Sequence, residues 1–241
     1  MSRTTSAVLL LALATGAAGC ESTQSKSARL EGQAGKSVDE KGLKVTKRAR
    51  SVQVRSTALL TDPNGTALIV ELRNTGSRAL ARVPLAVNVK GPGGASVYRN
   101  DVPGLETSLV SAALLPARAT QVWVNDQIAA TGPAKSARAL AGAGGREIKG
   151  DLPRLSVSGL KLENDETSGL AAVGRVRNRS AVEQRDLVVS VVARRGKRVT
   201  AAGRAVVRRL KAEGGANFTA FLIGDAKGAR LEATAPPTTL P

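Results

Sequence analysis

Residues 68–89 read LIVELRNTGSRALARVPLAVNV, which is two apolar alternations joined by a polar corner. Every second residue is apolar up to Leu72, and the alternation resumes from Val83 to Val89. This period of two, with β-branched side chains and turn residues between the runs, predicts two strands that each bury one face. Asn74 ends the first strand, where an Asn can bond its neighbouring backbone and tolerate a left-handed conformation.

The same pattern occurs a second time in the chain. Val176-Arg177-Asn178-Arg179-Ser180 matches Leu72-Arg73-Asn74-Thr75-Gly76, and an alternating run begins nine residues after each Asn. In the second copy this run extends from Leu187 to Ala193. Internal repetition favours two similar domains. Several short strands with frequent turns in roughly 100 residues favour a β-sandwich for each domain.

The second copy resembles the immunoglobulin-like modules of the FxLYD and CARDB type found on bacterial envelope proteins. The matching features are the corner, an alternating strand, a turn, a further strand end and an aromatic strand, at Val176–Ser180, Leu187–Ala193, Gly196–Val199, Leu210–Gly214 and Phe218–Leu222. Residues 48–130 are similar in a more diverged form. The resemblance implies an immunoglobulin-like β-sandwich for each copy.

The fold class expected from these features is all-β, with two tandem immunoglobulin-like β-sandwich domains. The first domain is expected over residues 48–132 and the second over 151–235. A linker is predicted at 133–150, where alanine-rich sequence could also form a helical turn. Residues 236–241 are predicted to be a flexible C-terminal tail.

The first twenty residues have the layout of an export signal. Arg3 supplies a positive start, Ala7–Ala14 is apolar, and small residues lead into Cys20. The apolar run is far shorter than the ~20 residues that a membrane-spanning helix needs. The ending at Cys20 resembles the lipobox of bacterial lipoproteins, although Ala17 stands where Leu is commonest. The resemblance implies that the signal peptide, residues 1–19, is removed and that the Cys20 thiol is lipidated.

Lipidation would hold the protein on a membrane through its N-terminus, since two or more acyl chains anchor stably. The alternative is an unlipidated secreted protein with Cys20 near the cleavage site by accident. Large apolar side chains are sparse over residues 20–47, so this segment is predicted to be a disordered tether. The expected location is the cell envelope, either on the outer side of the cytoplasmic membrane or at the outer membrane.

The net charge of +17 is spread along the chain, with local clusters near its end. The candidate anion-binding residues are Arg194, Arg195, Lys197, Arg198, Arg208 and Arg209. A basic surface attracts polyanions such as a wall polymer or anionic lipid, whereas the alternative is an arginine-rich face that is only solvated. Nucleic acid is not an expected partner, because export removes the chromosome and stacking aromatics are scarce.

The sequence offers no catalytic set. It contains no histidine, and its single cysteine lies at the predicted anchor, so Ser-His-Asp and Cys-His arrangements are excluded. No catalytic residue, metal ligand or cofactor is therefore predicted. The expectation is a non-enzymatic envelope lipoprotein that binds another envelope protein or wall polymer. The alternatives are a periplasmic chaperone or accessory factor for a secreted protein, and a polyanion binder.

Overall fold

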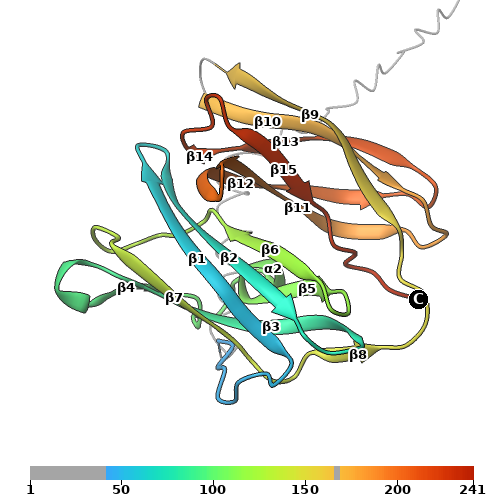
Figure 1. The fold of residues 1–241 in the computed structure, drawn as a ribbon, viewed down its shortest axis with the longest axis horizontal. Coiled ribbons are helices and arrows are strands. Elements are labelled where there is room, and N and C mark those ends of the chain that lie inside the picture. Colours follow the sequence, from blue (N-terminus) through green and yellow to red (C-terminus); the bar gives the residue numbers. More distant parts are fainter. Residues whose placement is uncertain (1–41, 166–168) are drawn as a thin grey trace, which may run out of the picture. The chain divides into compact units, whose positions relative to one another are not determined.

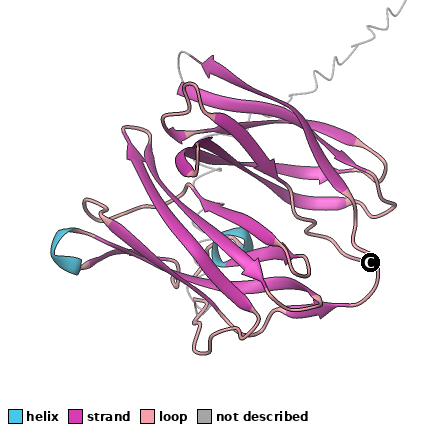
Figure 2. Ribbon diagram, viewed as in Figure 1, coloured by secondary structure: helices cyan, strands magenta, loops and turns pink. Residues whose placement is uncertain are grey.

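The computed structural model describes residues 42–165 and 169–241 (Figure 1), and the chain there is nearly all β, as Figure 2 shows. The predicted signal peptide, Cys20 and most of the predicted tether lie outside the described residues. Within the described residues, no helix is long and apolar enough to cross a membrane. The all-β prediction is confirmed.

The first half of the described chain contains eight strands and two short helical turns. The strands are β1 (Val52–Asp62), β2 (Gly65–Asn74), β3 (Ala79–Lys90), β4 (Ser96–Arg99), β5 (Ser111–Leu115), β6 (Thr120–Asn125), β7 (Ser136–Ala141) and β8 (Arg146–Ile148). The turns are η1 (Pro92–Gly94) and α2 (Thr107–Val110). One sheet has the order β1-β2-β6, and a second is centred on β3, which pairs with β4, β5, β7 and β8.

The second half repeats this arrangement with fewer, longer strands. They are β9 (Leu155–Asp165), β10 (Gly169–Asn178), β11 (Gln184–Arg195), β12 (Arg198–Leu210), β13 (Gly215–Phe221), β14 (Ile223–Gly224) and β15 (Arg230–Thr234). One sheet has the order β13-β10-β9 and the other β14-β12-β11-β15. Every strand pairing within the described residues is antiparallel. Strands β9, β10, β11, β13 and β15 take the places of β1, β2, β3, β6 and β7.

The apolar alternation places the two cores as predicted. Leu68, Val70 and Leu72 of β2 are fully buried in one cluster with the alternating residues of β3 and with Trp123. The residues from Leu187 to Ala193 that alternate along β11 are fully buried in a second cluster with Phe218. Each half therefore has its own core between two sheets.

The corner asparagines are structural in both halves. Asn74 is buried, its Nδ2 donates to the carbonyls of Arg78 (2.8 Å) and Leu115 (3.1 Å), and its Oδ1 accepts from Gly76 N. Asn178 is also buried, with carbonyl partners at Val182 and Lys211. Bonding to the neighbouring backbone is confirmed. Neither Asn adopts the left-handed conformation. Among the described non-glycine residues, Arg82, Arg118, Asp186 and Glu213 have a positive φ.

The segment predicted as a linker, 133–150, contains strands instead. β7 pairs with β3 from Lys90↔Ser136 to Leu85↔Ala141, and β8 pairs with the start of β3. β7 is rich in alanine, which has little intrinsic strand preference, so its structure comes from its pairing partner. In the predicted tail, the backbone N–H groups of Thr238 and Thr239 donate to the side chain of Gln184.

The two halves pack against each other through a third apolar cluster. It combines residues from β2, β6, β11, β12 and β14, namely Ala67, Ile69, Val124, Val192, Val199, Ala202 and Ile223. Residues 40–241 accordingly form one compact unit. The outer face of the first β-sheet is therefore an internal surface of the molecule.

Candidate functional site

A buried ion pair joins the two halves. Arg204 of β12 donates from its backbone N to Asp126 Oδ2 (2.8 Å) and from its Nε to Oδ1 (2.9 Å). The Arg204 side chain is only 2% exposed and that of Asp126 16%. The Arg204 Nη1 also donates to Ser108 Oγ in α2, at 3.1 Å. A buried charge is costly unless its partner is present, so moving the halves apart would leave Arg204 and Asp126 each without its counter-charge. The pair therefore favours one arrangement of the two halves.

Two further polar contacts strengthen this junction. Arg194 of β11 lies between Glu71 of β2 and Glu232 of β15, at 2.5 Å and 3.2 Å. The carboxylate of Asp62 accepts a hydrogen bond from Gly224 N at 2.7 Å. Together with the third apolar cluster, these contacts join the sheets of both halves within one compact unit.

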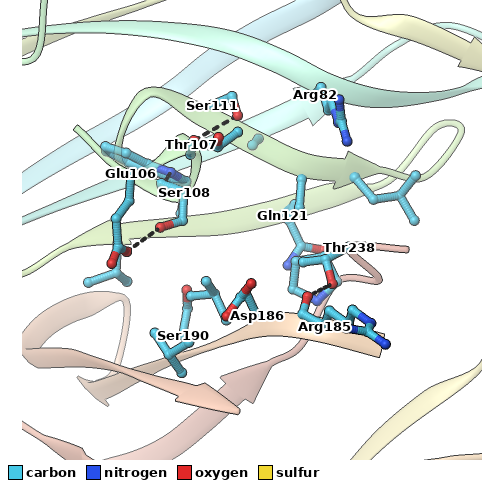
Figure 3. A pocket seen from close by; sticks show the side chains of 18 of the residues that line it. Arg82, Glu106, Thr107, Ser108, Ser111, Gln121, Arg185, Asp186, Ser190 and Thr238 are labelled. Carbon is cyan, nitrogen blue, oxygen red and sulfur yellow. Dashed lines mark hydrogen bonds between the residues drawn. The ribbon is translucent and has the colours of Figure 1, made fainter. Parts of the chain in front are cut away.

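A cleft of about 520 Å³ opens beside the junction (Figure 3). The first half contributes Trp123 and the segment Glu106–Ser108, and the second half contributes Val188 and Ser190. Backbone strain marks the same place: Arg82 (φ 52°) and Asp186 (φ 45°) both line the cleft. Each stands eight residues after its corner Asn, and such outliers cost of order 1–3 kcal/mol and concentrate at functional sites.

Three hydroxyl groups of the cleft donate hydrogen bonds to acceptors within the protein (Figure 3). Ser108 Oγ donates to Glu106 Oε2 at 3.3 Å, and it accepts from Arg204. Ser111 Oγ donates to the carbonyl of Thr107, and Thr238 Oγ1 donates to that of Arg185. The hydroxyls of Ser111 and Thr238 serve as fixed polar surface, because a nucleophile needs its proton directed at a base and a backbone carbonyl is not one.

The chemistry of the cleft suits an anionic ligand with hydrogen-bond acceptors. The Gln121 Nε2 atom is buried and has no hydrogen-bond partner among the described residues, although Gln121 lines the cleft. An unpaired buried amide is costly, and a ligand oxygen would satisfy it only if the side chain turned its Nε2 atom into the cleft. Three arginines and two carboxylates also line the cleft, namely Arg82, Arg185, Arg208, Glu106 and Asp186. Arg185 pairs with Glu183 and Arg208 with Asp186, so within residues 42–165 and 169–241 Arg82 is the one arginine of the cleft without an ion pair.

The predicted anion-binding residues do not form one patch. Arg194 is an internal residue of the junction, and Arg195, Arg208 and Arg209 pair with Asp225 (2.7 Å), Asp186 (3.2 Å) and Glu183 (2.8 Å). Lys197 and Arg198 are exposed in the β11–β12 hairpin. Arg198 and Arg208 lie near opposite ends of β12, roughly 30 Å apart at the usual rise of a strand.

Those ion pairs also set the acidities of their carboxyl groups. The hydrogen bond from Arg209 lowers the pKa of Glu183, and the one from Arg195 lowers the pKa of Asp225. Tyr98 differs, because burial raises the pKa of its phenol, and the hydrogen bond from Asn125 and the charge of Arg204 only partly oppose this. The Asn125 Nδ2 donates to the Tyr98 hydroxyl at 3.1 Å, so the phenol belongs to the polar network around the junction.

Sequence reasoning missed Arg204, Asp126 and Gln121. Arg204 follows Ala201, Ala202 and Gly203, and its partner lies 78 residues away, so no local pattern marks the pair. Gln121 occupies an ordinary position in a strand. A comparison of the two repeats would have found Arg82 and Asp186, which each stand eight residues after the corner Asn of their repeat.

Among known proteins, no family model and no curated sequence matches this chain, so the immunoglobulin-like and lipobox resemblances stay predictions.

Proposed function

We propose that this protein is a lipid-anchored envelope protein that binds another envelope component in the cleft between its halves, without catalysing a reaction. The observation that carries the proposal is the buried Arg204–Asp126 pair, which fixes the two walls of the cleft relative to each other. A preformed cleft avoids the entropic cost of ordering two loosely joined domains on binding.

The anchoring part of the proposal rests on the sequence around Cys20. Labelled palmitate fed to cells producing the full chain should be incorporated, and the Cys20→Ser variant should lose the label and leave the membrane fraction. Label that persists in Cys20→Ser would refute the anchor. This outcome would leave the cleft untouched, since the two claims depend on different parts of the chain.

The binding part of the proposal predicts a ligand that carries negative charge and accepts hydrogen bonds. Gln121 provides an unpaired amide, and Arg82 and Arg185 provide guanidinium groups from the two halves, that of Arg185 already paired with Glu183 at 3.1 Å. Arginine binds planar carboxylate and phosphate groups through two parallel hydrogen bonds. An acidic peptide and a glycerol phosphate oligomer therefore represent the two ligand classes, protein and wall polymer.

Nuclear magnetic resonance with these two probes tests the cleft. We expect one probe to shift the Gln121 side-chain amide and the Trp123 indole signals at millimolar concentration. The Arg185→Gln variant should weaken that binding, whereas Arg177→Gln removes an exposed charge on β10 outside the cleft and should not. If neither probe moves either signal, the cleft is not a binding site for these classes and the proposal fails.

A further inference from the structure

The chain enters the first half beside the end of β7, just before β1 (Figure 1). Ala143 N donates to the carbonyl of Lys47 (2.7 Å), and Ala49 N donates to that of Ala141 (2.9 Å). The last residues of the predicted tether are therefore bound to the fold. These bonds fix the place on the surface from which the chain runs back towards Cys20.

Positive charge gathers around this point of entry. A groove of about 720 Å³ between β1 and β7 has four exposed arginines and no carboxylate in its lining. The arginines are Arg48, Arg50, Arg55 and Arg138. Within residues 42–165 and 169–241, none of them forms a salt bridge. Lys44 and Lys47 come just before Arg48 in the chain and are also exposed.

Two carboxylates near these cations have partners of their own. One oxygen of Glu71 accepts from Ser56, which lines the groove, and the other pairs with Arg194 at 2.5 Å. Asp101, whose pKa the charge of Lys44 helps to lower, pairs with Arg99 at 2.5 Å. The positive charge of the groove is therefore not neutralised within the part of the chain that the structure describes.

Exposed apolar side chains adjoin the same point. Four large hydrophobic residues are exposed among those described, and two of them are Leu43 (36%) and Val102 (49%). The chain at Gly42 lies directly against the loop after β4, since a Cβ added there would be 1.8 Å from the carbonyl oxygen of Asp101 and 2.9 Å from the carbonyl carbon of Val102. Cations beside exposed apolar side chains are typical of protein surfaces that lie in a membrane interface.

We propose that this entry surface, formed by residues 43–50, Arg55, Val102 and Arg138, contacts the anionic headgroups of the membrane that carries the Cys20 anchor. The inference rests on the anchor proposed above. A disordered tether from Cys20 to Gly42, as the sequence predicts, has a mean end-to-end distance of about 25 Å, which holds the entry surface close to the bilayer. Attraction between arginines and an anionic bilayer acts within about 8 Å, so the surface must come into contact.

The chemistry of the entry surface favours a lipid over a soluble polyanion. Headgroup phosphates accept paired hydrogen bonds from arginine, and a glycerol phosphate polymer would offer the same groups. Only a bilayer also supplies an apolar layer for Leu43 and Val102. This surface is separate from the cleft and does not depend on what the cleft binds.

Paramagnetic relaxation in nanodiscs tests where the bilayer meets the protein. The full chain, processed in cells, is reconstituted into nanodiscs of phosphatidylcholine and phosphatidylglycerol that carry a spin label on a few headgroups. We expect the label to broaden the backbone amide signals of Leu43, Arg48 and Arg138, whereas the amide of Arg177 on β10 should stay sharp. Nanodiscs of phosphatidylcholine alone should give broadening at least about fivefold weaker, because these headgroups lack net charge.

Matched variants separate this surface from the general charge of the protein. Arg48→Gln with Arg50→Gln should reduce the broadening about tenfold or more, since each cation near an anionic bilayer contributes about fivefold. Arg175→Gln with Arg177→Gln removes the same charge from β10 and should have little effect. Leu43→Ser should also reduce the broadening, because it removes an apolar contact with the interface. Circular dichroism melting shows whether each variant is folded.

Two results would overturn the inference. One is equal loss of broadening from the two double variants, which would indicate unoriented attraction of a basic protein. The other is release of Arg48 and Arg138 from the label by a glycerol phosphate oligomer, with no effect of Leu43→Ser, which would assign the groove to a soluble polymer. If the full chain is absent from the nanodiscs, the anchor has failed and this inference with it. If the chain is present but no signal broadens, only this inference has failed.

Discussion

Arg204 and Asp126 share two hydrogen bonds across the junction of the halves, one from the backbone and one from the guanidinium group of the arginine. The two residues belong to different halves of the chain, so neither half contains a complete pair. Separating the halves would leave each charge beside apolar surface. The junction is therefore an integral part of the fold, and its loss should destabilise both halves.

Removing one member of this pair should destabilise the whole unit. Asp126→Ala leaves the Arg204 guanidinium buried without its partner, which typically costs about 3–5 kcal/mol. The double change Asp126→Leu with Arg204→Met should recover much of that loss, because apolar residues of similar volume often replace a buried pair at little cost. Urea denaturation measures both variants.

An exposed pair supplies the matched control for that measurement. Arg208 and Asp186 are mostly in water, and Asp186→Asn should change the free energy of unfolding by less than about 1 kcal/mol. A loss from Asp126→Ala no larger than this would contradict the role given to the buried pair.

The corner asparagines should contribute equally in both halves. Asn178→Ala leaves the carbonyls of Val182 and Lys211 without their donor, a loss of roughly 1–3 kcal/mol for buried acceptors. Asn74→Ala should cost a similar amount, because its Nδ2 also donates to two backbone carbonyls. An aspartate at either site keeps the Oδ1 acceptor but loses the donor, so it should not rescue stability. Rescue of stability by aspartate would mean that the Oδ1 acceptor in the turn, and not the Nδ2 bonds to the two carbonyls, supplies the stabilisation.

The sequence pattern predicted the features that depend on residues close together in the chain. The alternation at Leu68–Leu72 and Leu187–Ala193 identifies buried faces because a strand repeats every two residues. β7 was missed because Ala137, Ala139 and Ala141 are small and gain their strand structure only from β3. The linear sequence groups Arg194 with other cations, yet its carboxylate partner Glu71 lies 123 residues away. The cleft is equally non-local, since it needs both halves in register.

The ion pair at Arg209 should be visible in an acid titration. Its hydrogen bond lowers the pKa of Glu183, so the pair's contribution to stability is present above the unfolded pKa of about 4.3 and is lost as pH falls through the folded value. Arg209→Gln should raise the pKa of Glu183 towards its ordinary value. Carbon-detected magnetic resonance of the carboxyl group follows this directly. An unchanged pKa in the variant would show that Arg209 does not bond Glu183 in solution.

Tyr98 offers a test at the opposite end of the pH scale, because it is the only tyrosine in the chain. Burial raises the pKa of its phenol, so the folded state holds the proton more tightly than the unfolded state. The resulting stability is complete below the unfolded pKa of about 10 and is lost as pH rises through the folded value. Ultraviolet absorbance of the phenolate reports this single group. Asn125→Ala removes a hydrogen bond that lowers the pKa, so the titration of Tyr98 should move further upward; a downward shift would mean that the variant opens the junction to water.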